Sequence, residues 1–547
     1  MVGALIAPAV TPPAAGRRIL AVLLAGALIF GSVAAGLLVS RRLAVTGGLP
    51  RAAAARDTAT LYVGKPTTLD PAVAGDLSSA VSITQLFEGL TAFDPGLNLR
   101  PALASSWDTL EGGRRIVFHL RPNLQFSDGT TIHGADVVRS WMRLVDPAHP
   151  SPLVSLLRNV AGALDYATGR NRDPASVGIA ASGDDVEVRL TEPSPDVPSI
   201  VSSASFAVVP PGVGANPAAL TPGGFVASGA YILDSATEDT LTLKANPHYW
   251  AGRPEIGTVR LLITLHGKSP VAEYEAGNLD YTPIGDADAA WIAYDRVLGP
   301  SLRHVPSLAV TYYGFDTTRP PFNDVRVRRA FAQAVDWKRL VNLAGPASEV
   351  PANSMVPTGI PGHPTRDFTP SYDPGAARAA LAQAGYPNGA GFPDVTLVTA
   401  GGRIDEAVIA QIGANLGVPI GYETMETAPY FDRLGTDPPA FWSLSWVADY
   451  PGANDFLGIL LGTGQSSNYG RWASPEFEGA LAQAGSATDA SGVTTALERA
   501  QEVISRDAPV IPVSYGTGWA LSRAGLLGAG QNGLGVPRLA GLAWANP

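Results

Sequence analysis

Apolar and polar residues alternate along several short segments of the chain. Residues 115–120 and 186–190 carry apolar side chains at every second position, which predicts half-buried strands. From residue 325 to residue 343 the apolar positions recur every three to four residues instead. Asp324 stands where a helix cap is expected, so this segment predicts an amphipathic helix. Strands and helices follow one another without strict alternation, which indicates a mixed α/β fold with several sheets.

One long segment near the amino terminus is apolar throughout. Residues 19–40 hold no charge and lie between Arg17-Arg18 and Arg41-Arg42. At a rise of about 1.5 Å per residue, such a helix spans a hydrocarbon core of about 30 Å. The segment therefore predicts one transmembrane helix, with residues 1–18 in the cytoplasm and residues 41–56 as a linker.

The same segment allows a cleaved signal as well as an uncleaved anchor. Ser32-Val33-Ala34 offers the small-x-small pattern that signal peptidase uses. The apolar run continues beyond it through Leu37, Leu38 and Val39, which favours an anchor.

Charge and composition exclude several classes of protein. Six of the 38 basic residues precede Asp57, the first acid, so the remaining 32 face 48 acidic residues and the body carries a formal charge of −16. An acidic body lacks the basic surface that a nucleic-acid partner requires. The chain has no Cys, which excludes disulfides, thiolate metal sites and a lipid-anchored cysteine. With 547 residues, it is long enough for several domain-sized units.

No motif for catalysis or cofactor binding stands out. The seven histidines are spread along the chain and form none of the spacings that zinc sites use. Gly267-Lys268-Ser269 is similar to the end of a phosphate-binding loop, but Leu262 replaces its first glycine. The sequence predicts no cofactor, no metal and no catalytic residue, although carboxylate pairs for a hydrolase stay open because acids are plentiful.

An ordered set of motifs resembles a known family over residues 57–520. The motifs are Leu69-Asp70-Pro71, Leu86-Phe87-Glu88-Gly89-Leu90, residues 101–107, Phe118-His119-Leu120-Arg121, residues 126–130, Ala135-Asp136-Val137-Val138, Ser228-Gly229-Ala230-Tyr231, residues 246–250, residues 320–328, Tyr372-Asp373-Pro374, Ala384-Gly385-Tyr386-Pro387 and residues 507–512. The set is similar to the peptide/nickel-type (family 5) extracytoplasmic solute-binding proteins of ABC transporters, which include oligopeptide- and dipeptide-binding proteins.

This resemblance implies an α/β fold with two lobes, a hinge and an inserted extra domain. Ligand is expected between the lobes, which close on it by bending at the hinge. The implied parts are lobe I at 57–92, 223–310 and 511–547, the inserted domain at 93–222, lobe II at 311–510, and hinge strands near 312–315 and 510–515.

The resemblance also implies a site in the segment Trp446-Val447-Ala448-Asp449-Tyr450-Pro451. In similar proteins the Asp at this position pairs with the α-amino group of a peptide. A buried ammonium needs such a carboxylate, because a lone charge is costly to desolvate. From residue types alone, a surface Asp that caps a turn would explain the segment better. The predicted ligand-binding residues are Asp449, Trp446, Val447, Asn468, Arg471, Tyr281 and Tyr313.

Two positions depart from the family pattern near this site. Asp316 stands where relatives carry Asn, and Ser445 where Gly is common. Both departures bear on the local geometry of the cleft.

The resulting prediction is a non-enzymatic peptide-binding component of an ABC importer. Its partners are a peptide ligand, a permease and an ATPase on separate chains, and the membrane through the N-terminal helix, with no nucleic acid. It is expected on the extracytoplasmic face of the bacterial cell membrane, or free in the periplasm if the signal is cleaved. The open alternatives are a sugar, glycolipid or metal chelate as ligand, an envelope regulator, and an enzyme.

Overall fold

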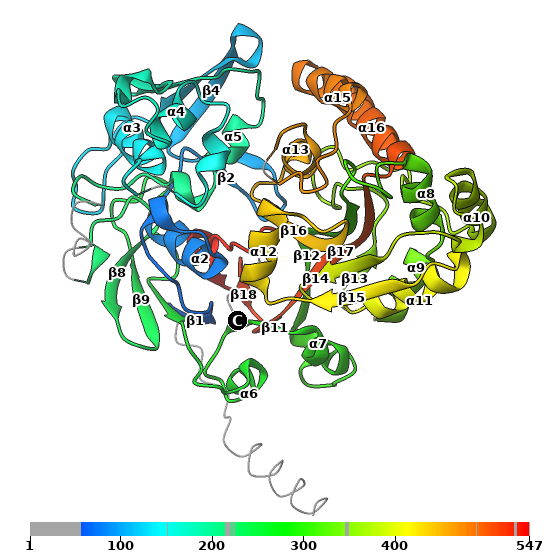
Figure 1. Cartoon of the computed structure of the whole chain (residues 1–547). Helices are drawn as coiled ribbons and strands as arrows, with labels where there is room; N and C mark the ends of the chain where they lie inside the picture. The colour runs from blue at the N-terminus through cyan, green and yellow to red at the C-terminus, as the bar shows by residue number, and fades with distance from the viewer. Residues whose placement is uncertain are drawn as a thin grey trace, which may run out of the picture. The chain divides into compact units, whose positions relative to one another are not determined.

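Two long strands, β12 (Leu302–Phe315) and β17 (Val510–Ser522), run antiparallel through the largest sheet (Figure 1). The computed structural model describes residues 56–149, 151–213, 220–222, 225–344, 349–465, 467–487, 489–529 and 533–545. Within these residues the sheet has the order β15-β14-β16-β12-β17-β11-β1-β10-β9-β8, and β13 also pairs with β17. The two long strands therefore join the halves of the sheet.

The remaining strands of this sheet are short. They are β1 (Thr58–Tyr62), β8 (Tyr231–Ala236), β9 (Thr240–Ala245), β10 (Thr258–Leu262), β11 (Tyr281–Ile284), β13 (Glu349–Pro351), β14 (Val395–Thr399), β15 (Ile420–Thr424) and β16 (Phe441–Val447). The pairs β1 with β10 and β14 with β15 are parallel, whereas β16 pairs antiparallel with β12. This mixture of parallel and antiparallel pairs confirms the predicted mixed α/β class.

A second sheet lies in the segment that the sequence predicts as an inserted domain. Its strands, in sheet order, are β4 (Ala104–Leu110), β5 (Arg115–Leu120), β7 (Asp185–Arg189) and β6 (Ile179–Ser182). Every second residue of β5 is buried, which confirms the strand predicted at 115–120. Two small two-stranded sheets are also present: β2 (Thr91–Phe93) with β3 (Leu99–Pro101), and β18 (Leu526–Leu527) with β19 (Ala543–Trp544).

Helices surround both sheets (Figure 1). They are α2 (Leu77–Leu86), α3 (Gly134–Met142), α4 (Ala163–Ala167), α5 (Val197–Ile200), α6 (Pro270–Glu275), α7 (Asp286–Ile292), α8 (Val325–Gln333), α9 (Trp337–Ala344), α10 (Pro374–Gln383), α11 (Asp405–Leu416), α12 (Thr427–Thr436), α13 (Ala453–Phe456), α14 (Gly458–Leu461), α15 (Pro475–Ser486) and α16 (Ala490–Asp507).

The helix predicted at 325–343 is wrong in one respect, because two helices occupy it. The backbone N–H of Asp336 donates to Oε1 of Gln411 on α11 (2.8 Å), so α8 does not continue through this residue. The Asp336 carboxylate then accepts from the N–H of Arg339 (3.2 Å), as a cap at the start of α9 does. A turn between two short helices therefore replaces one long helix.

Separate hydrophobic cores form under the different parts of the sheet system. One core gathers around Phe118 and Trp141 in the second sheet, and it also takes up Tyr450 from the chain after β16. A second core lies under β1, β8, β9 and β10, and two more lie on either side of β12 and β16. Tyr450 thus packs against a core built almost wholly from residues 72–208.

In the part of the chain that the structure describes, no helix has the length and apolar character needed to cross a membrane. The predicted transmembrane segment, residues 19–40, lies outside the described residues.

Candidate ligand-binding cleft

The segment after β16 carries the strongest candidate site. Trp446 lies opposite Val310 in the β12–β16 pair, and the N–H of Ala448 still donates to the carbonyl of Leu308 (2.8 Å). The chain leaves the sheet at Asp449. The sheet therefore fixes the backbone up to the residue before the predicted amine-binding acid.

The buried carboxyl group of Asp455, on α13, accepts two hydrogen bonds from the segment 446–449. Its Oδ2 accepts one hydrogen bond from Nε1 of Trp446 (3.0 Å) and one from the backbone N–H of Asp449 (3.2 Å). The Asp455 side chain is 0% exposed. Because both donors belong to the 446–449 segment, one side chain sets the indole orientation and the start of the loop together.

A cavity of 280 Å³ lies beside Asp449. Segments that are far apart in sequence line it, as is usual for a small-molecule site. They are residues 74–77, 80 and 84 around the start of α2, Phe93, Leu153, residues 202–205 after α5, residues 447–449 after β16, and Leu534, Val536 and Arg538 near the carboxyl terminus.

Two of the charged groups that line the cavity have partners within the protein. Nη1 of Arg538 forms an ion pair with Oε1 of the buried Glu88 (2.7 Å). The Asp76 carboxylate accepts hydrogen bonds from the hydroxyls of Thr67 (2.5 Å) and Ser79 (2.6 Å). Burial alone would raise the pKa of Asp76, but these hydrogen bonds outweigh it and hold the pKa below its usual value.

Asp449 differs from both groups, because no ion pair or side-chain hydrogen bond to it is found among the described residues, and its side chain is half-buried. Burial raises the pKa of Asp449 to about 6. For Asp455 burial is again the main cause, the Asp449 charge adds to it, and the pKa lies well above the usual value. Both neighbouring carboxyl groups thus have a raised pKa, and that of the enclosed Asp455 is affected more strongly.

A third carboxyl group approaches from the start of α5. The half-buried Asp196 accepts a hydrogen bond from the hydroxyl of Tyr450 (2.9 Å), and its withdrawal from solvent raises its pKa. Tyr450 is the residue after Asp449, so this bond ties the loop to a segment 254 positions earlier in the chain. The site combines three acids and no base that pairs with Asp449 within the described ranges.

Comparison with known proteins identifies the family of this chain. The profile described as "Bacterial extracellular solute-binding proteins, family 5 Middle" matches residues 98–468. The "Probable deoxycholate-binding periplasmic protein YgiS" of Escherichia coli (strain K12) is 31% identical over 467 residues, which cover 82% of this chain and 86% of that protein. The chain belongs to family 5 of the bacterial extracellular solute-binding proteins.

Other relatives and a solved structure agree with this family. The "Periplasmic oligopeptide-binding protein OppA" of Escherichia coli (strain K12) is 28% identical and covers 82% of this solute-binding protein and 85% of its own length. The structure titled "MppA Periplasmic Murein Tripeptide Binding Protein, Unliganded Open Form" superposes with a TM-score of 0.78 at 26% identity, over 89% of this chain and 97% of that one. The predicted family resemblance is confirmed, and so is the two-lobed mixed α/β fold.

Two of the seven predicted ligand contacts line the cavity of this solute-binding protein, and a third, Trp446, directly precedes them in the chain. Asp449 and Val447 line it, and the Val447 side chain is 55% exposed. Trp446 is half-buried, and its indole N–H is held by Asp455. These three residues stay candidates for direct contact with a ligand.

The other four predicted contacts lie elsewhere in this conformation. Tyr281 and Tyr313 are 2% and 1% exposed and belong to hydrophobic cores, and the Tyr313 hydroxyl donates to the buried Asp405 (2.5 Å). Asn468 is also buried, and its amide donates only to backbone carbonyls, one of them that of Trp472 (2.7 Å).

Arg471 points to a buried acid instead of the cavity. Its Nη1 lies 3.4 Å from Oδ2 of Asp316, which is 0% exposed and also pairs with Arg319 (2.6 Å). Asp316 is one of the two positions where the sequence departs from the family. In the structure it forms an ion pair with Arg471. Arg471 takes part in this ion pair and does not line the cavity.

Sequence reasoning missed Asp455, Asp196, Asp76 and Arg538. The one available signal was the position of Asp455, six residues after Asp449 and at the start of a short helix. The other three lie far from Asp449 in sequence, and only the tertiary fold brings them to the same region.

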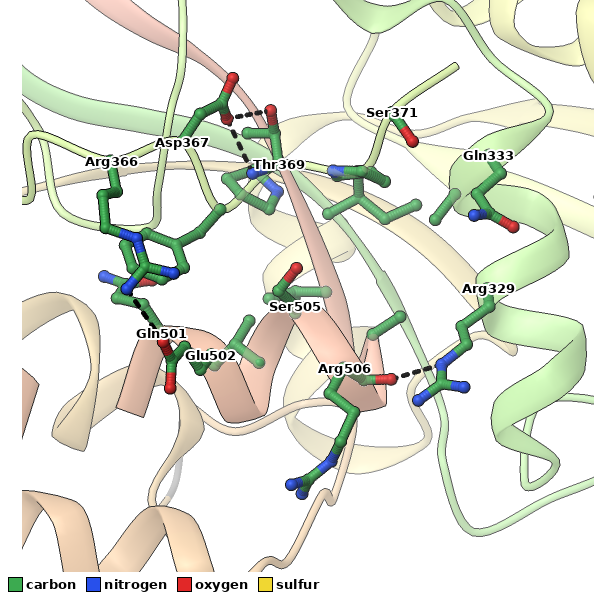
Figure 2. A pocket seen from close by; sticks show the side chains of 18 residues that line it. Arg329, Gln333, Arg366, Asp367, Thr369, Ser371, Gln501, Glu502, Ser505 and Arg506 are labelled. Carbon is green, nitrogen blue, oxygen red and sulfur yellow. Dashed lines mark hydrogen bonds and ion pairs between the residues drawn. The ribbon is translucent and has the colours of Figure 1, made fainter. Parts of the chain in front are cut away.

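A larger cavity, of 550 Å³, lies between α8, α16 and the loop at 366–371 (Figure 2). Several polar side chains that line this cavity form hydrogen bonds or ion pairs with other residues of the protein. Arg366 pairs with Glu502 (3.0 Å), Asp367 accepts from the Thr369 hydroxyl (2.6 Å), and Nε of Arg329 donates to the carbonyl of residue 506 (2.5 Å). No residue of the 446–451 segment lines it. The smaller cavity beside Asp449 is therefore the stronger candidate site.

Proposed function

We propose that this chain is the extracytoplasmic peptide-binding component of an ABC importer and captures peptides through their free amino terminus. The observation that carries the proposal is the Asp449 carboxyl group. It faces a cavity lined by distant segments and pairs with no cation among the described residues. Family membership supports a binding role over catalysis, so we propose that the ligand is released unchanged.

The physical reason for an amine ligand is desolvation. The fold withdraws Asp449 from water without giving it a partner, which is unfavourable unless a ligand supplies the opposite charge. A peptide ammonium donates charge-assisted hydrogen bonds to such a carboxylate. Val447 lines the same cavity and is 55% exposed, so it offers apolar surface for the first side chain of the peptide.

We further propose that the cavity is the interlobe cleft. The boundaries are lobe I at 57–92, 223–310 and 511–547, the inserted domain at 93–222 and lobe II at 311–510. The lining supports them, since residues 74–84 and 534–538 would come from lobe I, residues 93, 153 and 202–205 from the inserted domain, and residues 447–449 from lobe II. The hinge would then be β12 and β17, and a ligand that contacts every part would favour closure.

The importer also needs partners beyond the ligand. A permease and an ATPase on separate chains would receive the peptide. Residues 19–40 would anchor the chain on the outer side of the cell membrane, unless the segment is cleaved as a signal.

A second candidate ligand comes from the relative named as a probable deoxycholate-binding protein. Deoxycholate is an anion with a large apolar surface. The unpaired charge of this cleft is the carboxylate of Asp449, and Arg538 already pairs with Glu88. An anion would therefore meet repulsion where an ammonium meets attraction, which favours the peptide.

A thermal-shift screen of the full chain tests the proposal. The probes are di- to octapeptides, an N-acetylated copy of each peptide that binds, and deoxycholate. A ligand at 100 times its dissociation constant stabilises the fold by about 2.7 kcal/mol. We expect free peptides to raise Tm and their acetylated copies to have no effect.

Two variants make the screen specific. Asp449→Asn should abolish the shift, whereas Asp432→Asn, which removes an exposed acid from α12, should keep it. A shift with deoxycholate and with no peptide would reject the peptide proposal and support the second candidate.

A further inference from the structure

The Asp449–Asp455 pair raises a question about charge that the proposed function leaves open. Two ionised acids would give the cleft a double negative charge at this point, whereas one ionised and one neutral acid would give a single charge. The first arrangement suits a dication and the second a single ammonium group.

The surroundings of Asp455 disfavour its ionised form. Its side chain is 0% exposed, and both of its hydrogen bonds reach the same oxygen, Oδ2. Its other oxygen, Oδ1, is buried without a hydrogen-bond partner in the described part of the chain. A carboxylate spreads its charge over both oxygens, so a buried oxygen without a donor makes ionisation unfavourable.

The two charged groups that act on Asp455 are both acids, and both favour its neutral form. Asp449 belongs to its own loop, and Asp196 approaches from the start of α5 through the Tyr450 hydroxyl. On the cavity side, the Asp76 carboxylate accepts hydrogen bonds from Thr67 and Ser79, and the Arg538 charge is paired with that of Glu88. Neighbouring acids, with no base paired to them within the described residues, favour keeping a proton on one member.

The geometry decides which member keeps the proton. Asp449 lines the cavity, where a ligand can reach it, whereas Asp455 is fully enclosed. The enclosed group has more to gain from being neutral.

We propose that Asp455 is a positioning residue that works as a neutral acid, so that the cleft presents one negative charge, on Asp449, and takes a single ammonium group there. The inference rests on the proposed function for the identity of the ligand. Asp455 orients Trp446 and the Asp449 backbone without adding a charge. The described residues also hold no cluster of acids and histidines that could bind a metal ion, which fits a monovalent amine better than a metal cation.

Infrared spectroscopy tests the protonation state without any ligand. At neutral pH the full chain should show a protonated-carboxyl band that Asp455→Asn removes and that Asp432→Asn leaves in place. An unchanged band in Asp455→Asn would overturn the proposal, because it would mean that Asp455 is ionised. This outcome is independent of whether peptides bind, so it separates the inference from the proposed function.

Titration with trialanine, or with the shortest peptide that gives a thermal shift, tests the positioning role. Asn is neutral and keeps an acceptor for Trp446, so Asp455→Asn should bind within about threefold of the wild type. Asp455→Ala loses the acceptor and should bind about tenfold or more weakly.

Two results would overturn the positioning role. Equal loss in both variants would show that the charge of Asp455 is needed, and full affinity in Asp455→Ala would show that no positioning takes place. A thermal scan of each unliganded variant checks that it is folded. The infrared result remains valid for every variant that proves to be folded.

Discussion

The hydroxyl of Tyr450 donates a 2.9 Å hydrogen bond to Oδ2 of Asp196, across 254 positions of sequence. Tyr450 is 1% exposed and packs in the core of the second sheet, although it follows β16 in the chain. The bond therefore holds the loop that carries Asp449 against a different part of the protein. The position of the candidate amine-binding acid depends on this contact as well as on the sheet.

Replacing Tyr450 by Phe should lower stability by about 1–2 kcal/mol, because the half-buried Asp196 loses its donor. Chemical or thermal denaturation measures the change. Tyr294→Phe is the control, since the Tyr294 side chain is 90% exposed. Equal stability of both variants would show that the Tyr450 bond contributes nothing.

Peptide affinity should fall in mildly acidic solution. Burial raises the pKa of Asp449 to about 6, and only the ionised form attracts an ammonium. Affinity should be highest near pH 7, because the peptide ammonium loses its proton above about pH 8, and it should fall up to tenfold per pH unit below about pH 6. Isothermal titration over this range measures it. Affinity that holds down to about pH 4 would indicate an Asp449 with an ordinary pKa.

Stability should depend on pH through Asp455. Its pKa in the folded state lies well above that of an unfolded Asp, mainly because of burial, so the folded state binds the extra proton. Unfolding free energy then falls as pH rises above about 4, by at most about 1.4 kcal/mol per unit. Asp455→Asn removes this loss, so its Tm relative to wild type should rise between about pH 5 and pH 8. A Tm difference that stays flat would contradict a neutral Asp455.

Strand β12 should not tolerate a side chain at Gly314. A Cβ at this position would lie 2.2 Å from Cζ2 of Trp442, its partner on β16. Trp442 is buried and cannot move away freely, so Gly314→Ala should destabilise the protein by about 1–3 kcal/mol. Gly435→Ala in α12, where a Cβ meets nothing within 4 Å, should be neutral or stabilising. Thermal denaturation compares the two.

Tyr313→Phe separates a core role from a ligand contact. The Tyr313 hydroxyl donates to Asp405, which is 0% exposed and also accepts from Thr399 (2.9 Å) and Tyr422 (3.1 Å). We expect a loss of about 1–2 kcal/mol in stability and unchanged peptide affinity. Weaker binding with unchanged stability would restore the original prediction that Tyr313 contacts the ligand.

The fold class could be predicted from the sequence, and a candidate site segment could be named, for a local reason. The alternation in β5 and the motif from Trp446 to Pro451 are each contained in a few consecutive residues. The tyrosines of β12 could not be assigned this way. Neighbouring strand residues point to opposite faces, but both faces of β12 are covered, so Tyr312 and Tyr313 are each only 1% exposed.

The residues that contact the candidate site segment could not be predicted, because these contacts depend on long-range packing. Asp196 reaches the loop only after the second sheet folds and takes up Tyr450. Asn468 and Arg471 lie close to the site in sequence, yet one caps backbone carbonyls and the other pairs with Asp316. Spacing along the chain does not reveal which partner a side chain has in the folded protein.

Calorimetric titration of one peptide and its N-acetylated copy into the full chain and into Asp449→Asn tests the central claim most directly. The account predicts that acetylation and the substitution each weaken binding by about 2–4 kcal/mol, roughly 30- to 1000-fold, and that combining them adds little more. An acetylated peptide that binds wild type as tightly as the free peptide would contradict Asp449 as the amine-binding residue.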